Sequence, residues 1–426
     1  MTVILKNPLI IDPAAGLHQR GDLLLADGVV AALGGSYDPA DYPGAQVVEA
    51  GGLCAAPGLI DMHVHLRDPG QTHKEDILTG CEAAAAGGFT AVACMPNTSP
   101  ACDSPETVSY ILQKAAPAKA RVFPVAAITY GLRGDTLCDF AALRAAGAVA
   151  VSDDGRPVES PDMMAQALTE AAKAGLPVIS HCEDLRLVAG GIMHKGSVSQ
   201  QLGVPGIDRA SEDQSTAREL RLAEETGARL HIAHVSTAGS VELIRQAKAR
   251  GVRVTCETAP HYLLLTHQSL LGRDANYRMN PPLREQEDVE ALLAGIADGT
   301  IDAIATDHAP HTPEEKADFD RAPNGVIGLE TSLAACITAL VEPGVITLPR
   351  LIELMSASPA RLLGVEGGSL AVGSRADVVV FDPAAQWVVE PEARHSRSRN
   401  TPFAGMTLTG RVRYTFLAGR PTYESR

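Results

Sequence analysis

The chain has 426 residues, of which 45% are hydrophobic and 20% charged, the composition of an ordinary globular protein with room for one large domain and a smaller one. Its formal net charge of −15 argues against nucleic acids and anionic membrane surfaces as partners, because both bind basic patches, and leaves a small anionic substrate open. The sequence shows no run of ~18 apolar residues, no signal-peptide pattern and no C-x-x-C pair among its 8 cysteines, so we expect a cytoplasmic protein with reduced thiols.

Both ends of the chain have the pattern of short strands. Residues 1–55 and residues 367–426 alternate apolar runs with Gly, Pro and Asp turns. Each segment alone is too small to bury a core, so we expect the two segments to pair with each other.

The middle of the chain, residues 56–366, repeats a strand, a loop and a helix. The repetition predicts an α/β fold of the (β/α)8 TIM barrel type, and an open doubly wound sheet is less favoured because no G-x-G-x-x-G follows a strand. The predicted strands are the apolar or β-branched runs at 59–66, 89–96, 121–129, 148–154, 177–183, 230–236, 252–258 and 302–310.

Histidines and aspartates gather at the ends of these runs. His63 and His65 lie two apart in "LIDMHVHL", so both face one side of a strand and can reach one ion, although a single H-x-H pair is weak evidence. Four further runs end in the same residue types, at Asp153 and Asp154, His181, His234, and Asp307. Since barrel active sites form at the carboxyl ends of strands, and imidazole and carboxylate are ligands of Zn²⁺, the whole set predicts a metal site on one rim.

The other histidines lie in helical or loop stretches, or in the wrong strand phase. We expect these to be surface or structural residues: His18, His73, His194, His231, His267 and His395. The role of His308 is left open.

The chain resembles the cyclic amidohydrolases of the metal-dependent hydrolase superfamily, and among them the bacterial dihydroorotases of the longer type (class I). The stretches that carry the resemblance are "PGLIDMHVHLRDPG", "GGFTAVACMPNTSP", "VSDDG", "ISHCED", "IAHVST", "YRMNPPLR", "IDAIATDHAPHTPEEK" and "RAPNGVIGLET". They follow one another through the barrel region, and "GSLAVGSRADVVVFDP" and "NTPFAGMTLTGRV" extend the likeness nearly to the end. The resemblance implies a barrel with a small β-sandwich domain formed by both chain termini.

The resemblance also implies a binuclear zinc site that is bridged by an aspartate and a hydroxide. The ligands implied by position are His63, His65 and Asp307 for one Zn²⁺, His181 and His234 for the other, and Asp154 as the bridge. On physical grounds alone, the sequence does not separate Asp153 from Asp154.

The identity of the bridge bears on the substrate. Hydantoinases, dihydropyrimidinases and allantoinases also resemble this chain, but they bridge their metals with a carboxylated lysine. Here the stretch "GAVAVSDDGRP" contains no lysine, and an aspartate already supplies two oxygens and a negative charge. This favours a zinc-dependent dihydroorotase of pyrimidine biosynthesis, which interconverts N-carbamoyl-L-aspartate and L-dihydroorotate.

Asp307 is implied to have a catalytic role besides metal binding. As a terminal ligand it would take the proton of the attacking hydroxide and pass it to the ring nitrogen. The alternative is a purely structural ligand.

Substrate contacts are expected just past the strand ends. Arg67 lies two residues after His65, and its guanidinium offers a planar, bidentate match to the substrate carboxylate, although a surface ion pair is the alternative. The family places further contacts to the carboxylate and to the ring amides, so that the expected substrate-binding residues are His65, Arg67, Asn97, Asn280, His311, Asn324 and Gly325.

Two positions depart from the family pattern. Asn324 in "APNG" stands where the family usually has an aromatic residue, and Tyr262 in "APHY" stands where it usually has a histidine. Both concern contacts to the ring and neither is a metal position. The charged, Pro-containing stretch 308–323 is predicted to be a surface loop near the site that acts as a lid.

Two other functions stay open. One is another cyclic amidohydrolase, and the other is a structural dihydroorotase-like subunit of an aspartate transcarbamoylase complex, against which the full ligand set argues. The resemblance leads us to expect a homodimer and leaves open an association with aspartate transcarbamoylase. Sequence alone does not determine which metal binds, or how many ions.

Overall fold

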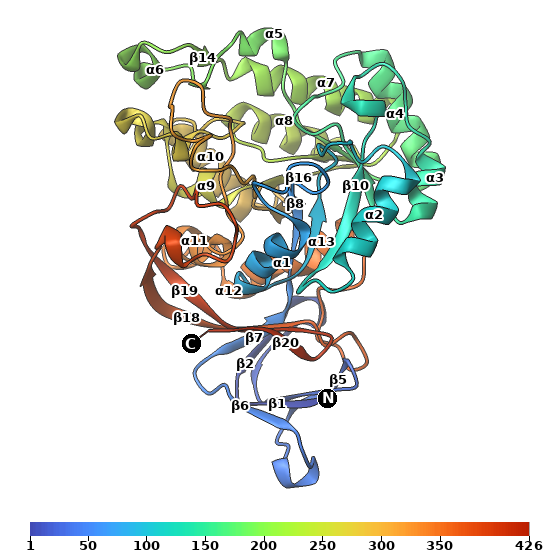
Figure 1. The fold of residues 1–426 in the computed structure, drawn as a ribbon, viewed down its shortest axis with the longest axis vertical. Coiled ribbons are helices and arrows are strands. Elements are labelled where there is room, and N and C mark those ends of the chain that lie inside the picture. Colours follow the sequence, from blue (N-terminus) through green and yellow to red (C-terminus); the bar gives the residue numbers. More distant parts are fainter. Residues whose placement is uncertain (426) are drawn as a thin grey trace.

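The computed structural model describes residues 1–425 and places a barrel above a β-sandwich (Figure 1). Eight parallel strands follow one another around the barrel in chain order, as predicted. A parallel bridge between Val64 and His308 joins the first strand to the segment after the last one and closes the barrel. The strands are β8 (Leu59–Val64), β9 (Phe89–Cys94), β10 (Arg121–Ala126), β11 (Ala150–Val151), β12 (Val178–Ser180), β15 (Leu230–Ile232), β16 (Val254–Thr258) and β17 (Ala303–Ile304).

The barrel strands are buried on both faces. Every residue of β8 and of β9 is buried, which suits a parallel strand that helices cover on one side and the barrel interior covers on the other. This explains why these runs are almost continuously apolar.

Helices follow the strands and pack around the outside of the barrel (Figure 1). Their ends match local sequence signals: α4, for example, starts after Ser160, whose Oγ accepts a hydrogen bond from Met163 N–H, and ends at Gly175, which has a φ of 73°. The α-helices are α1 (Ile77–Ala86), α2 (Pro105–Ala115), α3 (Phe140–Ala146), α4 (Pro161–Ala174), α5 (Leu185–Val188), α6 (Ser197–Leu202), α7 (Ala210–Thr226), α8 (Ala238–Ala249), α9 (Pro260–Leu264), α10 (Gln286–Ala297), α11 (Ser332–Cys336), α12 (Leu348–Ile352) and α13 (Ser358–Leu363).

Shorter elements decorate the barrel. A two-stranded ribbon of β13 (Met193–His194) and β14 (Gly206–Ile207) interrupts the path from β12 to α7. Single turns of 3-10 or π-helix complete the chain, at η1 (Pro13–Ala15), η2 (Pro39–Asp41), η3 (Tyr130–Leu132), η4 (His267–Gly272), η5 (Ala275–Tyr277), η6 (Ile337–Val341), η7 (Glu353–Ala357) and η8 (Pro391–Ala393).

The two ends of the chain build the sandwich together, as expected. β18 pairs antiparallel with β7, and β7 pairs parallel with β2, so that one sheet contains strands from both termini. That sheet has the order β20 (Arg420–Glu424), β19 (Thr407–Leu417), β18 (Val378–Val388), β7 (Cys54–Pro57), β2 (Leu9–Asp12) and β3 (Leu17–Arg20). The second sheet is wholly N-terminal, with the order β5 (Val29–Gly35), β4 (Asp22–Ala26), β1 (Thr2–Lys6) and β6 (Gln46–Glu49).

A separate apolar core lies inside the sandwich. It combines Val3 and Leu25 from the N-terminal part with Val378 and Phe416 from the C-terminal part. Neither part could bury these side chains alone, which is the physical reason for their pairing.

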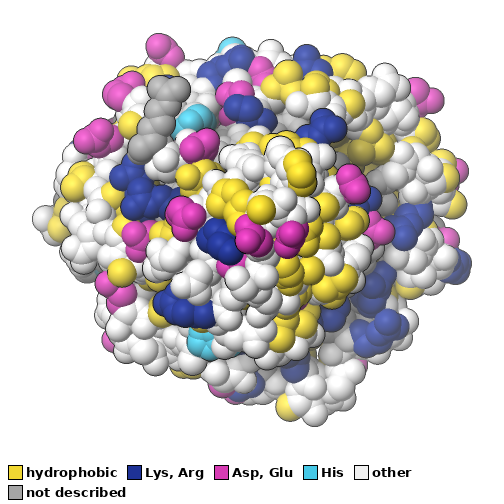
Figure 2. All heavy atoms as spheres, turned by 90° about the horizontal axis from the view of Figure 1, so that it is seen from below, with side chains coloured by type: hydrophobic (Ala, Val, Ile, Leu, Met, Phe, Trp, Pro, Cys, Tyr) yellow, Lys and Arg dark blue, Asp and Glu magenta, His cyan; other side chains and the backbone are white. Residues whose placement is uncertain are grey.

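The outer surface is mixed in character. Seen from the sandwich end, charged side chains of both signs lie among apolar and uncharged ones (Figure 2). Among residues 1–425, none of the helices combines the length and the apolar character that crossing a membrane requires.

Several strands are shorter than the sequence predicts. The run 148–154 contains only the two-residue β11, and the run 302–310 contains only the two-residue β17. The polar ends of these runs, including Asp154 and Asp307, lie in loops beyond the strands.

The stretch 308–323 is not simply the predicted surface loop. Lys316, Phe319 and Ala322 are buried, and the Lys316 ammonium donates hydrogen bonds to three main-chain carbonyls, those of Ala275 at 3.0 Å, Arg278 at 3.1 Å and Pro323 at 2.8 Å. The charged composition of the stretch therefore gave no sign that Lys316 is buried and anchors the stretch internally.

Candidate metal centre and substrate cavity

A cavity of about 220 Å³ lies at the carboxyl ends of the barrel strands. All the predicted site residues except His63 line it, although they come from loops far apart in the sequence. His63 lies just beneath, with a side chain that is 1% exposed. The fold therefore brings the predicted ligands and the predicted substrate contacts to one place.

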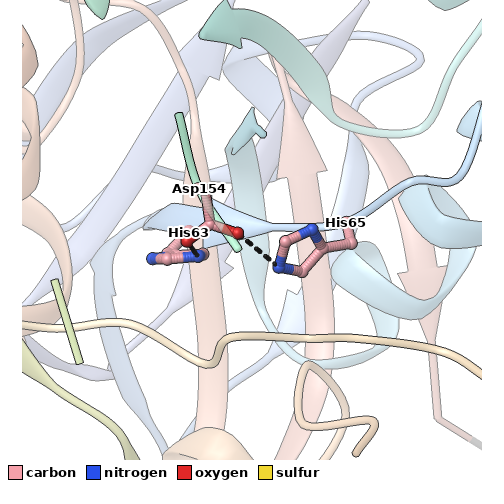
Figure 3. A group of neighbouring side chains, drawn as sticks. All are labelled: His63, His65 and Asp154. Carbon is pink, nitrogen blue, oxygen red and sulfur yellow. Dashed lines mark ion pairs between the residues drawn. The ribbon is translucent and has the colours of Figure 1, made fainter. Parts of the chain in front are cut away.

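The first group of potential metal ligands is His63, His65 and Asp154. His63 is the fifth residue of β8, and His65 follows the end of that strand, so both rings face the barrel mouth. Figure 3 shows both rings turned toward the Asp154 carboxylate, with His63 Nε2 3.4 Å from Oδ1 and His65 Nε2 3.5 Å from Oδ2. The three residues offer ligand atoms that lie within 4.8 Å of one another.

The second group shares Asp154 and adds His181 and His234. His181 Nδ1 lies 3.6 Å and His234 Nε2 3.7 Å from Asp154 Oδ1. The two imidazole nitrogens are themselves 2.8 Å apart. One carboxylate thus stands between two sets of imidazoles, which is the position of a bridging ligand.

Asp307 completes the cluster on the side of the first group. Its Oδ1 lies 3.0 Å from His65 Nε2 and 3.7 Å from His63 Nε2. This position allows it to act as a terminal ligand, and the residue also lines the cavity.

Unpartnered buried atoms show that these residues fit a metal ion. His63 Nε2 and Asp154 Oδ1 are buried and have no hydrogen-bond partner. Buried polar atoms are normally paired, and each exception calls for an explanation such as an ion. Nitrogen and carboxylate oxygen donors are the set that Zn²⁺ and similar divalent ions take.

The charges of the cluster depend on one another. Burial would lower the pKa of His63, but the Asp154 carboxylate raises it well above its ordinary value. Burial would likewise raise the pKa of Asp154 and of Asp307, but the neighbouring imidazoles hold both well below their ordinary values. A dication at this place would take over the role of those imidazole protons, because metal ligands must be deprotonated.

The structure distinguishes the role of Asp153 from that of Asp154. Asp153 Oδ1 accepts hydrogen bonds from the main-chain N–H groups of Ile128 and Thr129, at 2.8 and 3.1 Å. Asp153 therefore fastens the loop after β10, while only Asp154 faces the imidazoles.

Two buried acids behind His63 were not predicted from the sequence. Glu257 Oε1 lies 2.9 Å from His63 Nδ1, which leaves Nε2 to face the cluster. Asp61 Oδ1 accepts from the main-chain N–H of His63 at 3.0 Å and from that of Thr306 at 3.2 Å, and so ties β8 to the residue before Asp307. The available signal was an acid inside an apolar strand at Asp61, and an acid at the end of the seventh predicted strand at Glu257.

Glu183 is a third residue that the sequence did not reveal. Its carboxylate lies 3.2 Å from His181 Nε2 and accepts a hydrogen bond from Asn280 Nδ2 at 3.0 Å. It thereby orients a potential metal ligand and a predicted ring contact together. The Oδ1 atom of Asn280 is buried without a partner and remains available to a ligand.

Arg67 is a buried cation beside the cluster. Its side chain donates from Nε to the Pro310 carbonyl at 3.2 Å, and Nη2 lies 3.3 Å from His311 Nε2. Burial lowers the pKa of this guanidinium to about 10, so it stays charged at neutral pH. Among residues 1–425, no carboxylate oxygen lies within 4.0 Å of it. The alternative of a surface ion pair is therefore wrong.

The neighbouring loops supply polar groups that are already partly engaged. Asn97 Oδ1 lies 2.8 Å from His65 Nδ1, and the Asn324 carbonyl lies 3.0 Å from His311 Nε2. The N–H of Gly325 donates to the Arg278 carbonyl at 2.9 Å, so a substrate carbonyl would have to displace that bond to use it. Gly325 has a φ of 137°, and a Cβ there would meet Ala309 at 2.8 Å, so only glycine fits.

Three residues of the site have left-handed backbone conformations. Arg67, His234 and Asp307 have φ values of 59°, 34° and 48°. Such values are uncommon outside glycine and concentrate at functional sites. Here they turn the three side chains out of the strand direction and into the cavity.

Three further residues have supporting positions. Tyr262 does not line the cavity; its hydroxyl donates to the Pro281 carbonyl at 2.6 Å and so braces the loop of Asn280. The His308 carbonyl accepts from His65 N–H at 2.8 Å, which helps to close the barrel. His231 Nδ1 lies 2.8 Å from Thr255 Oγ1, which agrees with the structural role expected for it.

Comparisons with known proteins agree with this geometry. The family model described as "Dihydro-orotase-like" matches residues 52–240. The chain is 52% identical to "Dihydroorotase" of Geobacter sp. (strain M21) over 427 residues, covering 100% of both, and 49% identical to "Dihydroorotase" of Pelotomaculum thermopropionicum (strain DSM 13744 / JCM 10971 / SI), covering 100% of this chain and 99% of the relative. Among solved structures it is similar to the L-hydantoinase (dihydropyrimidinase) from Arthrobacter aurescens, with a TM-score of 0.87 and 29% identity over 99% of this chain and 96% of that one.

Proposed function

The chain belongs to the dihydroorotase family, and on that premise we propose that it catalyses the reversible cyclisation of N-carbamoyl-L-aspartate to L-dihydroorotate in pyrimidine biosynthesis, with two zinc ions as cofactor. One observation carries the choice of substrate. Arg67 is a buried guanidinium without a carboxylate partner that lines the same cavity as the metal-binding cluster. Dihydroorotate brings a carboxylate beside its cyclic amide, and a guanidinium binds such a group in a bidentate manner.

The metal ligands are assigned from the two groups that share Asp154. His63, His65 and Asp307 would hold one ion, and His181 and His234 the other, with Asp154 between them. Such ions, when bound, would lower the pKa of a water molecule toward neutrality and polarise the amide carbonyl.

The residues of the chain then have separate tasks. In the hydrolytic direction, Asp307 accepts the proton of the attacking water and delivers it to the ring nitrogen as the carbon–nitrogen bond breaks; in the synthetic direction the transfers reverse. The 3.0 Å contact with His65 positions its carboxylate for this exchange. Arg67, Asn97 and His311 hold the substrate carboxylate, and Asn280 and the Asn324–Gly325 segment hold the ring amides.

A second candidate is hydrolysis of an uncharged cyclic amide, because the structural relatives include hydantoinases. Two observations speak against it. No lysine lines the cavity as the structure describes it, which leaves Asp154 as the candidate bridging ligand, and the unpaired charge of Arg67 would face an uncharged ring. A homodimer and an association with aspartate transcarbamoylase stay predictions.

The test is a turnover panel on zinc-loaded protein, with the metal content determined on the same sample. The panel contains dihydroorotate, N-carbamoyl-aspartate, dihydrouracil, hydantoin and allantoin. We expect turnover of the first two only, in both directions. Turnover of the uncharged rings would overturn the assignment of Arg67, and bound metal without any turnover would point to a structural subunit.

A further inference from the structure

A second group of imidazoles lies outside the cavity. His194 on β13, His267 at the start of η4 and Glu285 before α10 each offer a ligand atom, and these atoms lie within 4.8 Å of one another. The histidine side chains are buried, at 2% and 4% exposure, while the Glu285 side chain is 36% exposed. The group is therefore internal but open to solvent on one side.

The spacing of these atoms is close to that of a metal site. His194 Nε2 lies 3.6 Å from Glu285 Oε2, and His267 Nε2 lies 4.0 Å from Glu285 Oε1. Tetrahedral zinc with bonds of 2.0–2.1 Å sets neighbouring ligand atoms roughly 3.3 Å apart. At the main centre the imidazole nitrogens stand 3.4–3.7 Å from the Asp154 oxygens, so the His194–Glu285 distance is of the same size. The His267–Glu285 distance of 4.0 Å would have to shorten by roughly 0.7 Å.

Unsatisfied atoms and open space accompany the group. His194 Nε2, the atom that faces Glu285, is buried without a hydrogen-bond partner. On His267 the unpartnered buried atom is Nδ1, whereas Nε2 lies 3.3 Å from Gln268 Nε2. Gly196 lies against them: a Cβ there would come within 3.2 Å of His194 Nε2 and 3.3 Å of Glu285 Oε1. The missing side chain thus leaves room beside two ligand atoms.

The imidazoles are neutral and can donate lone pairs. Burial, and then the guanidinium groups of Arg284 and Arg209, lower the pKa of His194 to about 3. Burial also lowers the pKa of His267. Arg284 Nη1 lies 3.5 Å from His194 Nδ1, a long contact on the edge of the ring that faces away from Glu285.

The surrounding charge suits a divalent cation despite the two arginines. Arg209 pairs with Glu285, Glu287 and Asp288, and Arg284 pairs with Glu212. These four carboxylates exceed the two guanidinium groups by two negative charges. Arg209 pairs with Glu285 at Oε2, the oxygen that lies 3.6 Å from His194 Nε2, so Oε1 is the oxygen left for a metal.

We propose that His194, His267 and Glu285 bind one divalent transition-metal ion of the zinc class, with water completing its coordination. The site is independent of the proposed reaction and has a structural role. It would fasten together the β13–β14 ribbon, which follows β12, with η4 and the start of α10, which both follow β16. The main-chain bond from His267 N–H to the Arg284 carbonyl, at 2.8 Å, already joins two of them.

The test compares zinc content by elemental analysis after loading with zinc and dialysis. The wild-type protein, His267→Ala and Glu285→Gln are measured together with Gln286→Ala, a control at the exposed neighbour of Glu285 whose side chain contacts Glu290 and not the site. We expect both site variants to hold about one zinc ion per chain fewer than the wild type and the control. Added zinc should also raise the unfolding temperature of the dialysed wild type more than that of the site variants.

Equal zinc content in all four proteins would overturn the proposal, and so would an equal response of the unfolding temperature to zinc. Two site variants are used so that a folding defect in one leaves the other to decide. Neither readout involves dihydroorotate, so failure of the proposed function and failure of this site are distinguished. Loss of zinc in His63→Ala would report on the main centre alone.

Discussion

Adjacent residues in one loop have opposite tasks at this site. Asp153 turns toward main-chain N–H groups after β10, whereas Asp154 turns toward four imidazoles. The choice depends on where the loop leaves β11, and both side chains are buried. A buried acid needs either hydrogen-bond donors or a cation as a partner. Here Asp153 has main-chain donors, and Asp154 faces the candidate metal position.

The first prediction concerns Arg67. We expect Arg67→Ala to lower kcat/KM for dihydroorotate roughly 10–150-fold, because loss of hydrogen bonds to a charged group costs ~1.5–3 kcal/mol. Metal content should be unchanged, since Arg67 lies outside the ligand set. Arg321→Ala, at a side chain that is 89% exposed, is the matched control and should behave like the wild type. Near-normal turnover of Arg67→Ala would contradict the prediction.

The second prediction concerns Glu257, which positions a ligand without facing the cavity. Glu257→Gln weakens the hydrogen bond to His63 Nδ1. Loss of such a partner of a metal ligand typically lowers metal affinity about 10–100-fold. The measurement is zinc affinity by competition with a chromophoric chelator. Glu219→Gln, at another buried acid that pairs with Arg218, controls for general destabilisation. Equal affinities in the two variants would rule out the positioning role.

At the scale of elements, the loops matter more than the strands that carry them. β11 and β17 are only two residues long, yet the loops after them deliver Asp154 and Asp307. The acid Glu212 on α7 fixes another such loop, because its Oε1 accepts from the N–H groups of Ser236 and Thr237 at 2.9 and 3.2 Å, just after His234. Rigid support from helices thus positions ligands on irregular backbone.

The third prediction concerns the stretch 308–323 and the buried Lys316 within it. We expect Lys316→Met to speed amide hydrogen exchange in this loop roughly 10–100-fold, because three carbonyls lose a buried donor at ~1 kcal/mol or less each. The KM for dihydroorotate should rise, because His311 belongs to this stretch and Asn324 directly follows it.

Lys173→Met, at a side chain that is 66% exposed, is the control for that experiment. Exchange in the loop that equals the wild-type rate would refute the anchor. Slower exchange of residues 308–323 in the wild-type protein after dihydroorotate is added would support the predicted lid, and unchanged exchange would contradict it.

At the scale of the whole molecule, closure joins distant parts of the chain. The bridge from Val64 to His308 closes the barrel, and the pairing of β7 with β18 joins the two termini beneath it. Both contacts connect the segment that carries His63 to residues much later in the sequence. Metal binding and global folding are therefore expected to be coupled.

The fourth prediction concerns acid stability. Burial lowers the pKa of His261 to about 4, against 6.5 in the unfolded chain. The unfolded state therefore binds more protons between these pH values, and the stability that His261 contributes is lost as pH falls from 6.5 to 4, at ~1.4 kcal/mol per pH unit.

Urea unfolding of chelator-treated protein between pH 7 and pH 4 measures the effect. His261→Gln should lose up to ~3 kcal/mol less stability over this range than the wild type. His18→Gln, at an exposed position, should follow the wild-type profile. Parallel profiles for His261→Gln and the wild type would contradict the prediction.

The sequence by itself determined the eight-strand order, the joining of the termini and most of the residues that line the cavity. It could do so because strand ends in a barrel meet on one rim, so residue type and strand position suffice. Apolar runs for β8 and β9 and the H-x-H spacing of His63 and His65 are local signals that survive folding unchanged.

Only the tertiary structure decided the partners behind those residues. Glu257, Glu183 and the Lys316 anchor act across chain separations that no local pattern records, and the turn of Asp153 away from the cluster depends on the loop after β10. The pairing of His194 with His267 and Glu285 was hidden for the same reason. Spacing along a chain reports which face a side chain takes, whereas contacts between distant segments exist only once the chain has closed.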